Sequence, residues 1–190
     1  MQSRYECLTL IGKGSTSSVY RARRLADDRV FAYKVVRLSG FSEAQRREIL
    51  NEVEVMSRMR HPSVVAYEES FVQSDTLHIV MELLPGGDLA HEIEARAGEA
   101  TSGEEGGEAG EAVGALPPGR FDEEDIWSIL VQVCEGLHHV HAQRVLHRDV
   151  KAENIFCDGK GAVKIGDLGL GRLLSTGSSH ARTGVGTPLY

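Results

Sequence analysis

The octapeptide HRDVKAEN at residues 147–154 and the tripeptide DLG at residues 167–169 hold the densest group of chemically active side chains in this 190-residue chain. Asp149, Asn154 and Asp167 supply two carboxylates and an amide, with thirteen residues from Asn154 to Asp167. Oxygen ligands of this kind suit Mg²⁺, and a carboxylate beside them can orient a hydroxyl group and accept its proton. The two stretches therefore indicate hard-cation chemistry on a nucleoside triphosphate.

A glycine-rich turn, GKGSTSSV at residues 12–19, lies between two predicted strands near the start of the chain. Glycines let backbone N–H groups approach phosphate oxygens because no Cβ stands in the way. The turn is not a Walker loop, since the chain contains no GxxxxGK[ST] sequence, and it is not a dinucleotide-binding turn, since a strand rather than a helix follows it. Taken alone, it is equally compatible with phosphate binding and with an ordinary hairpin turn.

Lys34 and Glu52 are two opposite charges on apolar faces. Side chains alternate along a strand, so Lys34 shares its face with Ala32 and Val36. Glu52 projects from the apolar stripe of a helix predicted from Ser42, its N-cap, to about residue 60. A buried ammonium needs a counter-charge, so we expect Lys34 and Glu52 to form a pair. The alternative is that both are surface charges on long side chains.

The order of predicted elements indicates an α+β fold. Apart from the helix after Ser42, the first 84 residues are mainly strands, whereas the later part begins with a helix capped by Asp122 and then has short strands between residues 155 and 165. Strand-rich and helical parts in succession predict two lobes. The predicted strands of the first part lie at residues 5–11, 19–22, 30–38, 64–71 and 76–83.

An acidic segment separates the two parts of the pattern. Residues 98–112 contain five glutamates, five glycines and no basic residue, and without these glutamates the net charge of -7 falls to -2. Such a segment cannot bury enough apolar surface to offset its ordering entropy, so we expect a disordered insert at about residues 97–119. The alternative is an acidic docking tract for a basic partner.

Composition excludes several classes of protein. A chain with 41% hydrophobic and 26% charged residues is globular, and its negative net charge excludes a generally basic protein that coats nucleic acid. No apolar run approaches the roughly 20 residues of a membrane span, and the N-terminus shows no signal peptide. Three widely spaced cysteines, Cys7, Cys134 and Cys157, indicate free thiols. We therefore expect a soluble, cytoplasmic protein without nucleic-acid or membrane partners.

Taken together, the motifs resemble a eukaryotic protein kinase of the serine/threonine type, and specifically the NIMA-related kinase family, from Tyr5 to Tyr190 apart from the acidic insert. The resemblance implies a bilobal kinase fold with a five-stranded N-lobe and helix C at residues 1–84, and an incomplete, mainly helical C-lobe at residues 85–190, the rest of that lobe being absent. Its motifs are the glycine-rich turn, AYK at 32–34, Glu52, HPSVV at 61–65, IVMELLPGGDL at 79–89, HRDVKAEN, GDLGLGR at 166–172 and GTPLY at 186–190.

The resemblance also implies ATP and Mg²⁺ as cofactors and gives each motif residue a role. Asp149 would accept the proton of the substrate hydroxyl, Lys151 would stabilise the transferring phosphate, and Lys34 would hold the α- and β-phosphates and pair with Glu52. Asn154 and Asp167 would bind the metal. In the hinge, Met81 would be the gatekeeper and the backbone of Glu82 and Leu84 would bind adenine. The implied ATP-binding residues are Ile11, Gly12, Gly14, Val19, Ala32, Lys34, Met81, Glu82, Leu84 and Phe156.

Some positions depart from the family pattern or bear on specificity and regulation. Ser17 replaces the third glycine of the turn, and Leu168 replaces the aromatic residue of the DFG motif. Lys151 and Thr187 favour serine or threonine over tyrosine as the acceptor. Thr183 is the candidate phosphosite, whose phosphate would pair with Arg148 and order the activation segment.

Two functions remain open at this point. The first is an ATP-dependent protein serine/threonine kinase that acts on Ser/Thr hydroxyls of protein substrates, together with a regulatory protein partner and, by resemblance to the family, a cytoskeletal or centrosomal association. The second is a truncated, kinase-like scaffold that binds nucleotide or partners without transferring phosphate. The short chain favours the second, and we expect the 190-residue piece alone to be poorly stable and weakly active or inactive.

Overall fold

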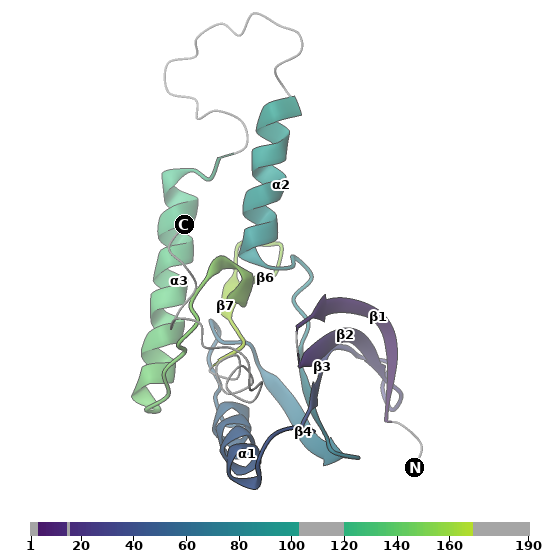
Figure 1. Ribbon diagram of the computed structural model, residues 1–190. Coiled ribbons are helices and arrows are strands. Elements are labelled where there is room, and N and C mark those ends of the chain that lie inside the picture. Colours follow the sequence, from purple (N-terminus) through teal and green to yellow (C-terminus); the bar gives the residue numbers. More distant parts are fainter. Residues whose placement is uncertain (1–3, 15, 103–119, 169–190) are drawn as a thin grey trace, which may run out of the picture.

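The computed structural model describes residues 4–14, 16–102 and 120–168, and its N-terminal part is built around one antiparallel sheet (Figure 1). The five strands follow the order β1-β2-β3-β5-β4. Helix α1, Glu43–Ser57, joins β3 to β4 and shares an apolar core with the sheet. The strands are β1, Tyr5–Lys13; β2, Ser17–Arg24; β3, Val30–Arg37; β4, Tyr67–Gln73; and β5, Thr76–Glu82.

The second part is mainly helical. It contains α2, Leu89–Ser102; α3, Glu123–Ala142; the short 3₁₀ helix η1, Ala152–Asn154; and a hairpin of β6, Ile155–Cys157, and β7, Val163–Ile165. Helices α2 and α3 lie side by side (Figure 1). The Arg96 guanidinium of α2 lies 3.9 Å from the centre of the Phe121 ring and 3.5 Å from the Asp125 carboxylate of α3. These contacts, the Arg96 clasp, hold α2 against the start of α3 and the residue just before its cap. The predicted α+β, two-lobed fold is confirmed.

Local sequence explains how the N-terminal lobe forms. Strand β3 is hydrogen-bonded along both edges, to β2 and to β5, so it is the central strand of the sheet. Ala32, Lys34 and Val36 are buried on one of its faces, and Phe31 and Tyr33 are buried on the other. Helix α1 begins with a capping box, in which the Ser42 hydroxyl accepts a bond from the Gln45 N–H and the Gln45 side chain accepts one from the Ser42 N–H. The predicted N-cap is thus confirmed.

One apolar core extends through both lobes. Ile49 and Met56 of α1, Val140 of α3 and Ile165 of β7 are fully buried members of the same cluster. Fully burying such side chains stabilises a fold by about 1.5–3 kcal/mol each. Backbone bonds add to this junction, because the Val65 N–H donates to Ile165 O at 2.9 Å and the Ile165 N–H donates to Ser63 O at 3.0 Å. The hairpin of the second lobe is therefore fixed to the segment that precedes β4.

Two expectations about element boundaries were wrong. Strand β4 begins at Tyr67 rather than Val64, because Val64 forms an isolated parallel bridge with Ile165. Helix α2 runs to Ser102, so residues 98–102 of the acidic segment are helical rather than disordered. Glycine and glutamate content alone did not reveal that a preceding helix extends into this segment. The remaining residues of the predicted insert, 103–119, lie outside the described part of the chain.

Within the described ranges, no helix combines the length and the apolar character that crossing a membrane requires.

Candidate active site

A cavity of about 650 Å³ lies between the sheet and the β6–β7 hairpin. The sheet supplies Ile11, Val19 and Ala32, and the hairpin supplies Phe156. The segment after β5 closes a third side. Gly86 is required there, because a Cβ at this position would lie 2.7 Å from the carbonyl oxygen of Cys157. Of the predicted nucleotide-binding residues, those that line the cavity are Ile11, Gly12, Val19, Ala32, Met81, Glu82, Leu84 and Phe156, together with the predicted metal ligand Asp167.

Lys34 and Asp167 form the central ion pair of the site. The Lys34 ammonium lies 2.5 Å from Asp167 Oδ1, and Lys34 is only 5% exposed. Strand β3 holds Lys34 between Val19 of β2 and Ile79 of β5, so the ammonium emerges from an apolar surface. Lys34 and Gly14 are not among the residues that line the cavity. The Lys34 ammonium nevertheless contacts Asp167, which does line the cavity.

The expected pair of Lys34 with Glu52 was wrong for this structure. Among the described residues Lys34 forms its ion pair with Asp167, and Glu52 has no ion-pair partner. Burial raises the pKa of Glu52, and repulsion from Glu48 raises it further, while the positive charge of Arg148 opposes the shift. The sequence showed that both charges need a partner, but it could not show that Asp167, 133 residues away from Lys34, reaches the ammonium.

A second cluster gathers three predicted catalytic and metal-binding residues. The side-chain amide of Asn154 donates to Asp149 Oδ2 at 3.0 Å and to the Asp149 carbonyl at 2.7 Å, and it is buried. The Lys151 ammonium lies 3.5 Å from Asp149 Oδ2. The short helix η1 produces this arrangement, since it turns the chain between Lys151 and Asn154. The structure thus brings Asp149, Lys151 and Asn154 together as the sequence predicted.

His147 lies between the two clusters. It is 2% exposed, and the charges of both Asp149 and Asp167 act on its imidazole. Burial nevertheless lowers the pKa of His147, which keeps the ring neutral near pH 7. A neutral, buried ring suits a packing role better than a role as a charged acid.

Backbone conformation around the acidic residues is unusual. Arg148 and Asp167 have φ angles of 66° and 52°, which residues other than glycine, asparagine and aspartate rarely adopt. Such residues cost on the order of 1–3 kcal/mol each and gather at functional sites. Next to Asp167, a Cβ on Gly166 would lie 2.7 Å from the Phe156 ring and 3.0 Å from Val65, so this position requires glycine.

The residues present fit a nucleoside triphosphate bound with a divalent cation. Apolar side chains above and below the cavity can hold a planar base, and the Lys34 ammonium can bind phosphate oxygens. Asp167 and Asn154 offer oxygen ligands of the kind Mg²⁺ takes. Within the described part of the chain, the Asn154 amide oxygen accepts no hydrogen bond, which leaves it available as a ligand.

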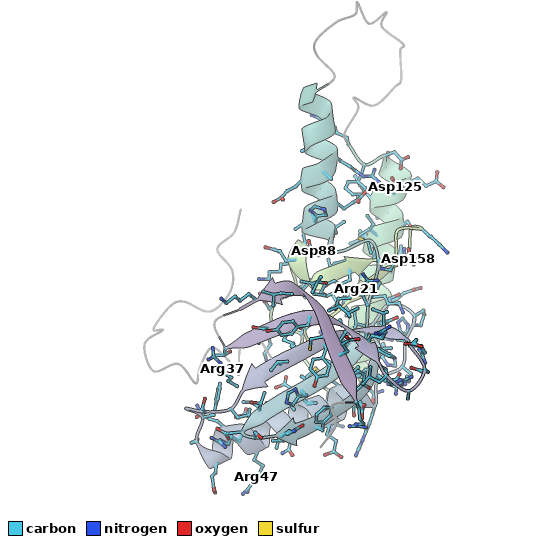
Figure 2. All side chains as sticks on the ribbon, turned by 90° about the vertical axis from the view of Figure 1, so that its right-hand side faces the viewer. Arg21, Arg37, Arg47, Asp88, Asp125 and Asp158 are labelled. Carbon is cyan, nitrogen blue, oxygen red and sulfur yellow. The ribbon has the colours of Figure 1, made fainter. Side chains whose placement is uncertain are left out.

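Sequence reasoning missed several residues of the cavity. Arg21 and Asp88 both line it, and Figure 2 shows them where the sheet meets the helical part. Arg21 is two residues after Val19 in β2, so strand alternation could have revealed that they share a face. The other missed lining residues are Val65, Leu83, Pro85, Gly87 and Glu153.

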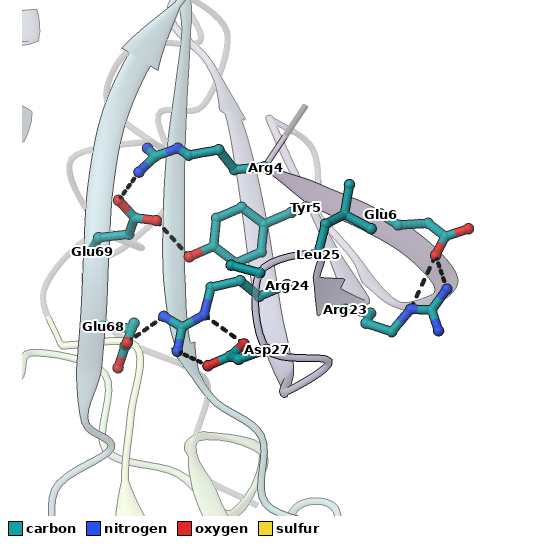
Figure 3. Close-up of a pocket in the computed structure, with 10 residues that line it drawn as sticks. Arg4, Tyr5, Glu6, Arg23, Arg24, Leu25, Asp27, Glu68 and Glu69 are labelled. Atoms are coloured by element: carbon teal, nitrogen blue, oxygen red, sulfur yellow. Dashed lines mark hydrogen bonds and ion pairs between the residues drawn. The ribbon is translucent and has the colours of Figure 1, made fainter. Parts of the chain in front are cut away.

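A larger hollow of about 1370 Å³ lies away from these clusters (Figure 3). Its charged side chains neutralise one another. Arg4 pairs with Glu69 at 2.9 Å, and Arg24 pairs with Asp27 at 2.6 Å and with Glu68 at 2.5 Å. This hollow contains no sequence-predicted site residue. The smaller cavity is therefore the candidate active site.

Comparison with known proteins shows the family of the chain. The protein kinase domain model matches residues 5–190. Relatives include the serine/threonine-protein kinases Nek1 of Mus musculus, 37% identical; Nek3 of Mus musculus, 35% identical; and Nek2 of Homo sapiens, 34% identical. Each alignment covers 98% of this chain, which spans 14%, 32% and 39% of these three relatives.

The chain belongs to the protein kinase family. It is also similar over nearly its whole length to Nek serine/threonine-protein kinases, which confirms the resemblance to the NIMA-related family based on motifs. The candidate phosphosite Thr183 and the GTPLY motif lie outside the described residues. Their roles stay predictions.

Proposed function

We propose that the protein is an ATP-dependent serine/threonine kinase that transfers the γ-phosphate of ATP to hydroxyls of protein substrates. The observation that carries the proposal is the pair of charged clusters beside the cavity, Lys34 with Asp167 and Asp149 with Lys151 and Asn154. Family membership supports the same reaction class.

The cavity residues bind and orient the nucleotide in this proposal. Val19 and Ala32 cover one face of the adenine, and Phe156 covers the other. The backbone groups of Glu82 and Leu84 hydrogen-bond the edge of the base. Lys34 holds the α- and β-phosphates, which places the γ-phosphate toward Asp149.

Asp149 and Lys151 act on the reacting atoms. Asp149 orients the serine or threonine hydroxyl and accepts its proton as the hydroxyl oxygen bonds to the γ-phosphorus. The bond between that phosphorus and the β-phosphate oxygen breaks, and ADP leaves. Lys151, whose ammonium lies 3.5 Å from Asp149, stabilises the negative charge of the transferring group.

Asn154 and Asp167 are the residues that would hold Mg²⁺, which neutralises phosphate charge when bound. In protein kinases, both the lysine–glutamate pair and the metal-bound aspartate must be in place for catalysis. Here Asp167 neutralises Lys34 directly. Asp167 would exchange the Lys34 ammonium for the metal if it held Mg²⁺, and that ammonium would then be available to phosphate oxygens.

The exposed apolar side chains of α3 favour the second candidate, a kinase-like scaffold that binds nucleotide or a partner. Trp127 is 57% exposed, and Ile126, Leu130 and Val131 are also exposed. Large apolar patches of this kind mark surfaces that contact other polypeptide. Protein substrates, a regulatory protein partner and a cytoplasmic, cytoskeletal or centrosomal location are further parts of the proposal and rest on family resemblance.

Two measurements on the same protein separate the candidates. The first is transfer of labelled γ-phosphate from Mg²⁺–ATP to casein, followed by identification of the labelled amino acid; the second is ATP affinity. For a kinase, wild type labels serine or threonine, whereas Asp149→Asn retains ATP binding and loses at least about 100-fold in rate. ATP binding without any transfer supports the scaffold. Equal rates for wild type and Asp149→Asn would remove Asp149 from its proposed role.

A further inference from the structure

A polar junction lies behind the cavity, where the hinge after β5 meets β7. Both carboxylate oxygens of Glu82 accept bonds from the Lys164 ammonium, each at 2.8 Å. Glu82 Oε1 also accepts a bond from the Ala66 N–H at 2.6 Å, and the Glu82 N–H donates to Ala66 O at 2.9 Å. No motif discussed above includes Lys164.

We propose that Lys164 is a positioning residue for the adenine end of the nucleotide site, acting through Glu82; the proposal rests on the nucleotide binding proposed above. Its ammonium holds the hinge at a fixed place relative to the β6–β7 hairpin, which supplies Phe156 to the cavity. Without this ion pair, the backbone groups that face the base would be free to move relative to Phe156.

The strand register shows why Lys164 can connect these two walls. Lys164 of β7 lies opposite Phe156 of β6, and directly opposite residues of an antiparallel pair project from the same face. Phe156 and Glu82 both line the cavity. The Lys164–Glu82 pair therefore links the β6–β7 hairpin, at the residue opposite Phe156, to the hinge.

Backbone bonds support the same junction from the other side. Segment 63–66 is bonded to Ile165 through Ser63 and Val65, and to Glu82 through Ala66. The hinge, the segment before β4 and strand β7 thus meet at one place. Lys164 supplies the ionic link of this junction, and the other links are backbone bonds or bonds to backbone.

The Lys164–Glu82 ion pair is partly buried. The Lys164 and Glu82 side chains are 22% and 31% exposed, so water screens them only in part. Bonds between charged groups are roughly twice as strong as neutral ones. With Lys164 removed, the Glu82 carboxylate would keep one bond, to Ala66, and would gain more by turning toward water.

The test compares ATP affinity across matched variants, measured by displacement of a fluorescent ATP analogue in the presence of Mg²⁺. A hinge held less firmly binds the base less well, so we expect Lys164→Met to weaken ATP binding about 5- to 10-fold. Lys164→Arg keeps a cation and should bind within about twofold of wild type. Lys160→Met is the control, because Lys160 is an exposed residue of the same hairpin and makes the same change in charge.

A second variant tests whether Lys164 acts through Glu82. Glu82→Gln keeps the shape and the backbone of the hinge, so it should weaken ATP binding to a similar extent, and the double variant should be no weaker than the stronger single one. In turnover, Lys164→Met should raise KM for ATP, while its kcat at saturating ATP stays within about twofold of wild type.

Specific outcomes overturn the proposal. ATP affinity of Lys164→Met equal to that of Lys160→Met refutes it, as do losses that simply add in the double variant. If Lys164→Met does not unfold cooperatively, Glu82→Gln decides by the same affinity criterion. A wild-type protein that binds ATP but transfers no phosphate refutes the kinase assignment alone, since the affinity comparison remains valid.

Discussion

Removing Asp167 from the Lys34–Asp167 pair should affect stability very differently from removing Lys34, although both changes should abolish phosphotransfer. Asp167→Asn leaves a 5% exposed ammonium without its counter-charge. Lys34→Met instead places an apolar side chain of similar length on a face shared with Ala32 and Val36, while Asp167, which is 33% exposed, can be solvated. The structure therefore predicts a large loss of stability for the first variant and little or none for the second.

The magnitude follows from the burial of the pair. Breaking a fully buried ion pair by removing one partner costs about 3–5 kcal/mol. Because Asp167 is one-third exposed and asparagine can still accept a hydrogen bond, we expect about 2–3 kcal/mol for Asp167→Asn. In a chain of this size, about 1 kcal/mol shifts the midpoint of unfolding by roughly 2–4 °C, so Tm should fall by roughly 5–10 °C.

The assay is thermal unfolding followed by circular dichroism without nucleotide. Asp28→Asn is a suitable control, since Asp28 is 80% exposed and also has a positive φ that asparagine tolerates. The double variant Lys34→Met/Asp167→Asn should recover most of the lost stability, because the uncompensated ammonium is gone. The reasoning is refuted if Lys34→Met lowers Tm as much as Asp167→Asn does.

Three further variants or conditions test other parts of the site. Glu52→Gln should raise Tm without nucleotide, because a neutral amide avoids the burial cost that raises the pKa of Glu52; a lower Tm contradicts this. Gly166→Ala should destabilise by about 1–3 kcal/mol in urea unfolding and weaken ATP binding, because the new methyl group would lie 2.7 Å from Phe156; unchanged stability rules out the close approach. Burial lowers the pKa of His147, so the unfolded chain takes up a proton below about pH 6.5 while the folded protein does not. The contribution of His147 to the free energy of unfolding is therefore complete above that pH and decreases as pH falls. The urea midpoint of wild type should fall between pH 7 and 5 more than that of His147→Gln, and an equal fall in both proteins contradicts this prediction.

Sequence reasoning succeeded where one local rule determines the structure. The alternation around Lys34 and the Ser42 cap were enough to predict the central strand and the start of α1. The spacing from Asp149 to Asn154 is equally local, since a single turn of 3₁₀ helix brings the two side chains together. The kinase motifs then predicted most of the residues around the cavity.

Long-range partners could not be predicted in this way. Three charged groups, Lys34, Glu52 and Asp167, compete within one region, and the choice among them depends on how α1 and the segment after β7 are placed. The pair of Lys164 with Glu82 joins residues 82 positions apart in sequence, and neither residue breaks a local pattern. Strand register, rather than composition, reveals that contact.

The Arg96 clasp has a consequence for engineering this protein. Because Arg96 holds Phe121 and Asp125 beside α2, the helices that enter and leave segment 103–119 are fixed to each other on the helical lobe. Added length between fixed anchors costs little, about 0.6 kcal/mol for each doubling of a flexible connection. A reporter domain inserted between these anchors should leave the nucleotide cavity intact, which makes this the natural attachment point for a fluorescent probe of the kinase.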